Sequence, residues 1–115
     1  MNRPLKFKVW NKKSNEWCGT IGLNETISHN ELEYDTDDLV FVQYTGLNDK
    51  NDKEICEGDI LEWKGEFIAE VFFEQENAAF VSKSKTDGKA FMSENYVLNF
   101  QIIGNIFEHK HLLEK

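Results

Sequence analysis

A period-two alternation of apolar and polar residues constrains the fold of this chain more than any other feature. In Leu5–Trp10 (LKFKVW), the apolar residues Leu5, Phe7 and Val9 point to one face, and Lys6, Lys8 and Trp10 point to the other. Such alternation is typical of a half-buried β-strand, and the 3.6-residue period of an amphipathic helix is nearly absent from the chain. Gly, Asn and Asp recur about every eight to twelve residues, as turns do between short strands. The sequence therefore predicts an all-β fold, with Lys6, Lys8 and Trp10 on the outer, basic face of the first strand.

Further predicted strands follow along the chain. They are Glu16–Leu23, Leu39–Thr45, Ile60–Lys64, Phe67–Phe73, Ala78–Lys83, Ala90–Met92 and Phe100–Phe107. The strands after Glu57 are joined by tight turns, which suits a small, strongly bent antiparallel barrel of the SH3-like type over residues 55–107. Residues 1–45 then supply N-terminal strands packed on the barrel, and residues 1–115 form a single domain. Gly104 is expected to mark a bulge or a close approach of two segments.

Helical structure is expected only as one or two short turns. Ser28 and Glu31 have the spacing of a capping box, which indicates a helical turn over Ser28–Tyr34. A second turn is expected to open at Ser93.

Charge and cysteine content indicate an acidic cytoplasmic protein. The formal net charge is −8, yet residues 1–15 carry five basic side chains and no acid. Cys18 and Cys56 form no metal-binding motif, so both are expected to be small core residues, with a disulfide between them left open. The basic N-terminus lacks an apolar signal region, and no apolar stretch approaches the roughly 18 residues of a membrane span. These features predict a reducing cytoplasm and no membrane partner.

Three segments of the chain resemble the YopX family of phage and prophage proteins. They are Arg3–Asn11 (RPLKFKVWN), Val42–Ile60 (VQYTGLNDKNDKEICEGDI) and Ile102–Glu108 (IIGNIFE), and they occur in the order found in the family. The resemblance implies an all-β fold with an SH3-type barrel and an origin in a phage or prophage of a low-GC Gram-positive bacterium. The resemblance does not indicate any particular biochemical activity.

Two positions depart from the family pattern. The family usually has Gly where this chain has Asp52, and often has an aromatic residue where this chain has Cys56. Because Asp tolerates the left-handed conformation less well than Gly, we expect that conformation to shift to Asn51. Two interpretations of the middle segment stay open, building the fold and binding a ligand. The first is favoured, because Gly46 suits a sharp exit from a strand and Asp59 can accept backbone N–H groups at a corner.

The sequence offers no catalytic or metal-binding constellation. The histidines His29, His109 and His111 neighbour no nucleophile elbow or phosphate loop. His109 and His111 lack a third ligand at a fixed spacing. The acids of residues 31–38 lack the glycine and the terminal glutamate of a calcium loop. We therefore predict no enzyme, no catalytic residue, no metal and no cofactor.

The leading functional hypothesis is a non-enzymatic phage or prophage accessory protein that acts through protein contacts. Trp10, Tyr44 and Trp63 are the candidate anchors, although each is also a candidate core residue. The strand Leu39–Thr45 is apolar on both faces, so that self-association into a homo-oligomer is one form of this hypothesis.

The alternative is nucleic-acid binding by the basic first strand. Lys6, Lys8, Lys12 and Lys13 lie close to Trp10 in the sequence, and cations beside an aromatic ring can form a stacking surface. The acidic remainder of the chain opposes such binding, which makes a nucleic acid the less expected partner.

Overall fold

The computed structural model describes residues 6–22, 38–65, 67–84 and 88–113. The chain divides into two compact units, Met1–Tyr44 and Thr45–Lys115. Strand β3 (Leu39–Asn48) crosses from one unit to the other. The expected helical turn at Ser28–Tyr34 lies outside the described residues.

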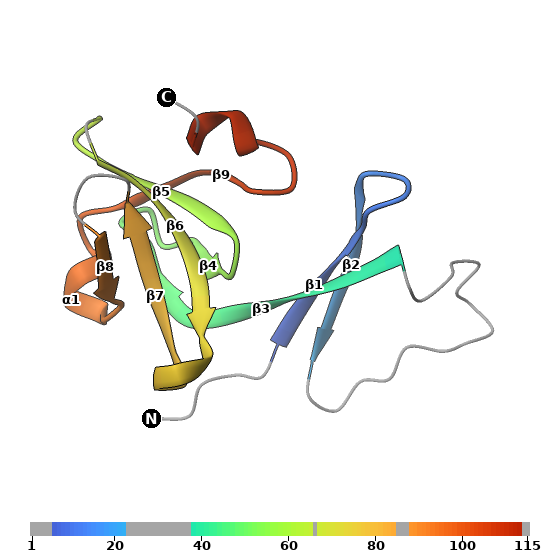
Figure 1. Cartoon of the computed structure of the whole chain (residues 1–115), viewed down its shortest axis with the longest axis horizontal. Coiled ribbons are helices and arrows are strands. Elements are labelled where there is room, and N and C mark those ends of the chain that lie inside the picture. Colours follow the sequence, from blue (N-terminus) through green and yellow to red (C-terminus); the bar gives the residue numbers. More distant parts are fainter. Residues whose placement is uncertain (1–5, 23–37, 66, 85–87, 114–115) are drawn as a thin grey trace. The chain divides into compact units, whose positions relative to one another are not determined.

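The N-terminal unit is an antiparallel arrangement of three strands (Figure 1). Strand β1 (Lys6–Asn11) pairs on one side with β2 (Glu16–Gly22) and on the other with the first half of β3. The β1–β2 register shifts between Val9 and Trp10, so that Trp10 lies opposite Trp17. Because directly paired residues share a face of a sheet, this register places Lys6, Lys8 and Trp10 on the same face as Trp17.

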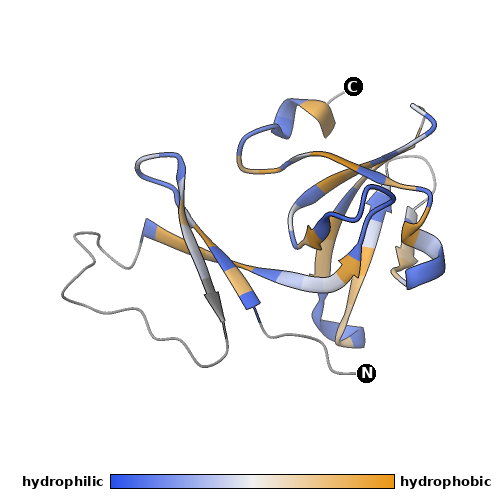
Figure 2. Cartoon of the chain, turned by 180° about the vertical axis from the view of Figure 1, so that it is seen from behind, coloured by the Kyte–Doolittle hydropathy of each residue, from blue (hydrophilic) through white to orange (hydrophobic). Residues whose placement is uncertain are grey.

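The C-terminal unit is built on a five-stranded antiparallel sheet in the order β8-β7-β6-β5-β9. Its strands are β5 (Asp59–Trp63), β6 (Phe67–Glu74), β7 (Ala79–Ser84), β8 (Gly88–Phe91) and β9 (Gln101–Asn105). Strand β4 (Glu54–Cys56) pairs with β3. The turns are hydrophilic, as the 3-10 helix Gln75–Asn77 between β6 and β7 shows (Figure 2).

The prediction of an all-β fold is confirmed. Helical structure in the described part of the chain is limited to single turns, namely α1 (Glu94–Val97) and the 3-10 helices Gln75–Asn77 and Lys110–Leu113. The predicted turn at Ser93 forms, because the Ser93 side chain caps α1 by accepting a hydrogen bond from the Tyr96 N–H at 3.2 Å. The packing of residues 1–45 on the barrel within a single domain stays a prediction.

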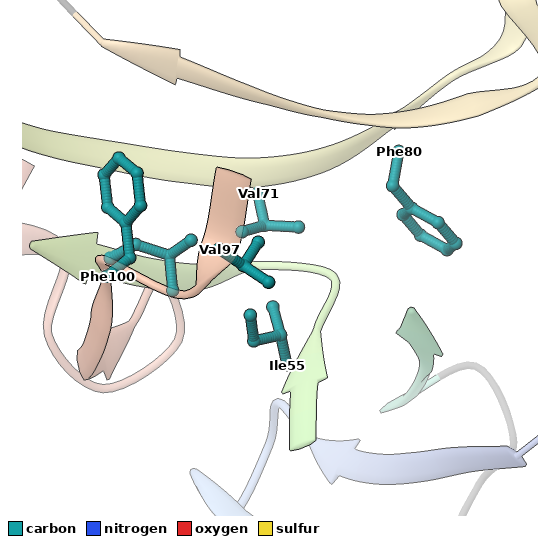
Figure 3. Packing of buried hydrophobic residues seen from close by; sticks show 6 residues of the cluster. Ile55, Val71, Phe80, Val97 and Phe100 are labelled. Carbon is teal, nitrogen blue, oxygen red and sulfur yellow. The ribbon is translucent and has the colours of Figure 1, made fainter. Parts of the chain in front are cut away.

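The core of the C-terminal unit lies between the sheet and the segment that carries α1. Val97 and Phe100 from that segment pack toward Val71 of β6 and Ile55 of β4 (Figure 3). Leu61 and Phe80 complete the cluster, and all six side chains are at most 5% exposed. The single helical turn α1 and the residues after it therefore cover the apolar face of the sheet.

Candidate functional site

The basic face predicted for β1 carries lysines that contact aromatic rings of the same unit. The Lys6 ammonium lies 4.3 Å from the centroid of the Tyr44 ring, and the Lys8 ammonium lies 4.2 Å from that of Trp17. Both distances fall within the range of cation–π attraction. Lys12 and Lys13 are exposed in the β1–β2 turn. The structure thus pairs Lys6 with Tyr44 and Lys8 with Trp17.

Trp10 does not lie on an accessible outer face, and that prediction was wrong. The side chain is only 4% exposed and meets Trp17 edge to face, with ring centroids 4.9 Å apart. The physical reason is the irregular β1–β2 register, which brings the half-buried Trp17 opposite Trp10, so that the two rings pack together. Trp10 is therefore a packing residue of the N-terminal unit.

Trp63, the third predicted anchor, lines a pocket in the C-terminal unit. The pocket has a volume of about 320 Å³. Its walls are aromatic and its floor consists of small residues on the inner face of the sheet. The lining residues are Trp63, Phe67, Ala69, Ser82, Ser84, Gly88, Ala90, Tyr96, Asn99 and Phe100. A cavity of this size with apolar walls and few polar groups is typical of a binding site for a side chain or small molecule.

The walls of the pocket are positioned by contacts among the aromatic rings. The Trp63 ring centroid lies 5.4 Å from that of Phe67 and 6.2 Å from that of Phe100, and Tyr96 lies 4.9 Å from Phe100. The hydroxyl groups of Tyr96 and the buried Ser82 are hydrogen-bonded at 2.9 Å. The pocket is therefore a preorganised, largely apolar recess with one fixed polar point.

No charged side chain is among the described residues that line the pocket. The Lys64 ammonium lies 4.9 Å from the centroid of the ring of Trp63, which is one of the lining residues. A cation already occupies this position, so a second cation bound against Trp63 would be repelled. The lining therefore favours a neutral apolar group over a charged one.

Comparison with known proteins places the chain in a family. A sequence profile of the YopX protein family matches residues 6–114. The chain belongs to the YopX family. It is similar to the crystal structure of protein EF1440 from Enterococcus faecalis, with a TM-score of 0.68 and 22% identity over 96% of this chain and 97% of that one. At this identity the likeness shows the fold alone. No curated protein matches the chain.

The middle YopX segment supplies polar groups that hold the C-terminal unit together. The Thr45 hydroxyl donates to the Ile55 carbonyl at 2.8 Å and accepts from the Leu47 N–H at 3.1 Å. The buried carboxylate of Asp59 accepts from the Cys56 N–H at 2.7 Å, as predicted for this corner. These contacts favour the fold-building interpretation of the segment.

Asp49 is the central polar residue of that segment. It is 4% exposed and its carboxylate accepts three backbone hydrogen bonds of 2.9 Å. Two come from Asn51 and Lys53 within the turn, and the third comes from Ile102 of β9. Asp49 therefore joins the middle YopX segment to the third one, which lies more than fifty positions further along the chain.

The third YopX segment forms a tight corner after β9. Asn105 accepts hydrogen bonds from the N–H groups of Phe107 and Glu108, and its own N–H donates to His109 Nδ1 at 3.2 Å. A Cβ atom on Gly104 would lie 2.7 Å from that same His109 nitrogen. The β5–β9 register also shifts at this point, so both a bulge and a close approach are present, as predicted.

Two other predictions in the YopX segments and their surroundings were wrong. Asp52 itself adopts the left-handed conformation, with φ of 63°, and Asn51 does not take it over. The Asp52 carboxylate accepts a hydrogen bond from the Asn48 amide at 2.8 Å, which supports the residue in place. Cys56 is buried as expected, but Cys18 is exposed, because the register shift in β2 leaves it without a directly paired residue.

The pocket was not predicted from the sequence, apart from Trp63. Phe67, Tyr96 and Phe100 were assigned only to strands or turns. One signal was present: Ala69, Ser82 and other small residues occupy inward positions of neighbouring strands, where bulky side chains normally fill a barrel. Small residues at such positions indicate a recess.

Other site types find no support in the described ranges. No group of three or more His, Cys, Asp or Glu side chains with metal-binding geometry occurs among the residues that were placed. Within the same residues, no helix has the length and apolar character needed to cross a bilayer. An ion pair joins Lys89 to Glu74, and the Lys89 hydrogen bond lowers the pKa of the Glu74 carboxyl.

Proposed function

We propose that this YopX protein is a non-enzymatic protein-interaction module whose barrel pocket receives an apolar side chain of a partner. The observation that carries the proposal is the aromatic-walled pocket of about 320 Å³ with no charged lining residue. Burial of a leucine-sized or phenylalanine-sized side chain against such walls contributes roughly 1.5–3 kcal/mol. A few contacts of this kind at the centre of an interface account for most of its affinity.

The cellular setting is part of the same proposal. We infer a phage or prophage accessory protein that acts in the cytoplasm of the bacterial host. Family membership supports the first half of this inference. The free thiols of Cys18 and Cys56 support the second, because disulfides are rare in reducing compartments.

Self-association is the other form that such contacts can take. In β3, Val42 is 1% exposed whereas the neighbouring Phe41 is 47% exposed. A second copy that covers Phe41 would explain an apolar residue on each face of this strand. Sedimentation of the wild type and of Phe41→Lys tests this: a dimer lost in the variant supports self-association, and a wild-type monomer argues against it.

The pocket is tested by blocking it. Ala90→Trp places an indole inside the pocket, and Gln75→Trp adds the same bulk on an exposed turn outside it. We expect affinity capture from the host to recover a stoichiometric protein with the wild type and with Gln75→Trp, but not with Ala90→Trp. Circular dichroism checks that all three proteins are folded. Equal recovery by the two tryptophan variants would exclude the pocket as the contact.

Nucleic-acid binding stays the alternative prediction. The lysines it relies on, Lys6 and Lys8, already lie over aromatic rings of the protein, and Trp10 is buried. Base stacking would require those ring faces. The protein-interaction proposal therefore has the stronger support.

A further inference from the structure

Strand β8 ends the five-stranded sheet beside the pocket. In the sheet order β8-β7-β6-β5-β9, β8 has β7 on one side and, within the described part of the chain, no strand on the other. It contains no proline, and its residues Lys89 and Phe91 are well exposed, at 51% for the Lys89 side chain and 61% for Phe91. The backbone groups that an end strand leaves unpaired are a template for pairing with a further strand.

The register determines which backbone groups face outward from β8. The Met92 N–H donates to the Phe80 carbonyl at 3.2 Å, which marks Phe80 and Met92 as a hydrogen-bonded pair. Hydrogen-bonded and non-hydrogen-bonded pairs alternate along an antiparallel ladder. Ala90 therefore points its backbone groups toward β7, and Lys89 and Phe91 point theirs away from it.

The same alternation links this edge to the pocket. Gly88 and Ala90 line the pocket, so the inner face of β8 forms part of its boundary. A strand added beside β8 would place every second side chain on that inner face. One of these side chains would lie next to Ala90, at the pocket.

The charge of Lys89, on the face of β8 away from the pocket, favours a partner strand that carries an acidic residue. Lys89 lies directly opposite Lys83 of β7, and like charges in this arrangement are unfavourable. Glu74 contacts Lys89 from the β6 side. An acidic residue on an incoming strand would complement Lys89 from the remaining side. The β8 strand of a second copy, Gly88–Phe91 (GKAF), would bring another lysine and no acid.

From this geometry we propose that β8 binds an extended segment of a partner protein as a sixth strand, with an acidic residue beside Lys89 and apolar residues on either side of it. The inference rests on the proposed function, since one of those apolar side chains is the one that enters the pocket. Backbone hydrogen bonds to Lys89 and Phe91 supply affinity, and the pocket and Lys89 supply selectivity.

The test uses a display library of linear peptides selected against the whole chain, followed by synthesis of the best binders. We expect the selected peptides to share an apolar–acidic–apolar pattern. Lys89→Pro removes an outward N–H that bonds no other strand of the sheet, a position at which strands tolerate proline. We expect it to weaken binding at least tenfold. The control Lys89→Met loses the charge and its Glu74 contact but keeps the backbone N–H, and we expect it to weaken binding about threefold. N-methylation of the peptide at alternate amides gives the same information if Lys89→Pro does not fold.

The outcomes separate the inference from the proposed function. Binders that are lost in Ala90→Trp but unaffected by Lys89→Pro and by N-methylation would overturn strand addition and leave the pocket proposal standing. Binders unaffected by Ala90→Trp as well, or a library with no binder tighter than about 100 µM, would overturn both. Dimerisation of the wild type that Lys89→Pro abolishes would show that the occupant of β8 is a second copy, and would overturn the assignment to a different protein.

Discussion

Replacement of Asp49 by asparagine tests whether this carboxylate holds the barrel together. The change keeps the size of the side chain but replaces one carboxylate oxygen by an amide nitrogen. One asparagine oxygen can still accept from the N–H groups of Asn51 and Lys53. The nitrogen then faces the Ile102 N–H, so two donors meet where a 2.9 Å hydrogen bond existed. The half-buried Ile102 N–H loses its partner.

The expected cost follows from these contacts. A buried donor without a partner costs about 1–3 kcal/mol, and the two remaining hydrogen bonds lose the assistance of a full charge. We expect Asp49→Asn to lower the free energy of unfolding by about 2 kcal/mol. With a urea m-value of about 1.5 kcal/mol/M, the unfolding midpoint should fall by about 1.3 M.

Urea unfolding followed by tryptophan fluorescence measures this loss. Asp52→Asn is the matched control, because it makes the same chemical change at an exposed carboxylate that accepts one hydrogen bond. We expect the control to change stability by less than about 0.5 kcal/mol. Amide exchange supplies a local readout, since the Ile102 amide should lose protection only in Asp49→Asn. Equal stability of the two variants, with Ile102 equally protected, would refute the assigned role.

Three further predictions follow from the fold. Asp52→Gly should raise the free energy of unfolding by about 0.5 kcal/mol, measured in urea, because glycine adopts the left-handed conformation without cost. A lower stability of this variant would mean that the lost Asn48 hydrogen bond outweighs the relieved backbone strain. Gly104→Ala should lower the free energy of unfolding by about 1–3 kcal/mol, because its Cβ would clash with His109. This cost should shrink in a His109→Ala background. If the two substitutions instead lower stability additively, the two residues are not in contact. Lys89→Met should raise the pKa of Glu74 toward 4.5 in an NMR titration, because the Lys89 hydrogen bond is the largest cause of the lowered pKa. An unchanged pKa would show that the Glu74–Lys89 pair does not form in solution.

The sign of the pH effect at Glu74 follows from its lowered pKa. A carboxyl whose pKa is lower in the folded state stabilises the protein above the pKa of the unfolded state, and this contribution is lost as pH falls through the folded value. The Glu74 hydrogen bond is the main cause of the raised Lys89 pKa. The contribution of the Lys89 ammonium to stability is therefore lost only as pH rises through its folded-state pKa, which lies above 10.5. The Lys89 side chain of this pair is 51% exposed, so solvent screens the interaction and the effect on stability is small.

The all-β class and most strand positions were determined by the sequence alone. Alternation at Leu5–Trp10 and Phe67–Phe73 identified β1 and β6, and the capping pattern at Ser93 identified the turn of α1. These features depend on local patterns of period two and on side chains that bond the nearby backbone. The family also followed from the sequence, since its three segments are continuous stretches of chain.

Which side chains meet depends on the tertiary fold. The register shift in β1–β2 buried Trp10 and exposed Cys18, and no local pattern marks such a shift. The pocket requires Trp63, Tyr96 and the small residues of three other strands to converge from distant positions in the sequence. Alternation specifies the face on which a side chain lies, but pairing between strands specifies its neighbours, and those neighbours determine whether the residue packs, binds or stays exposed.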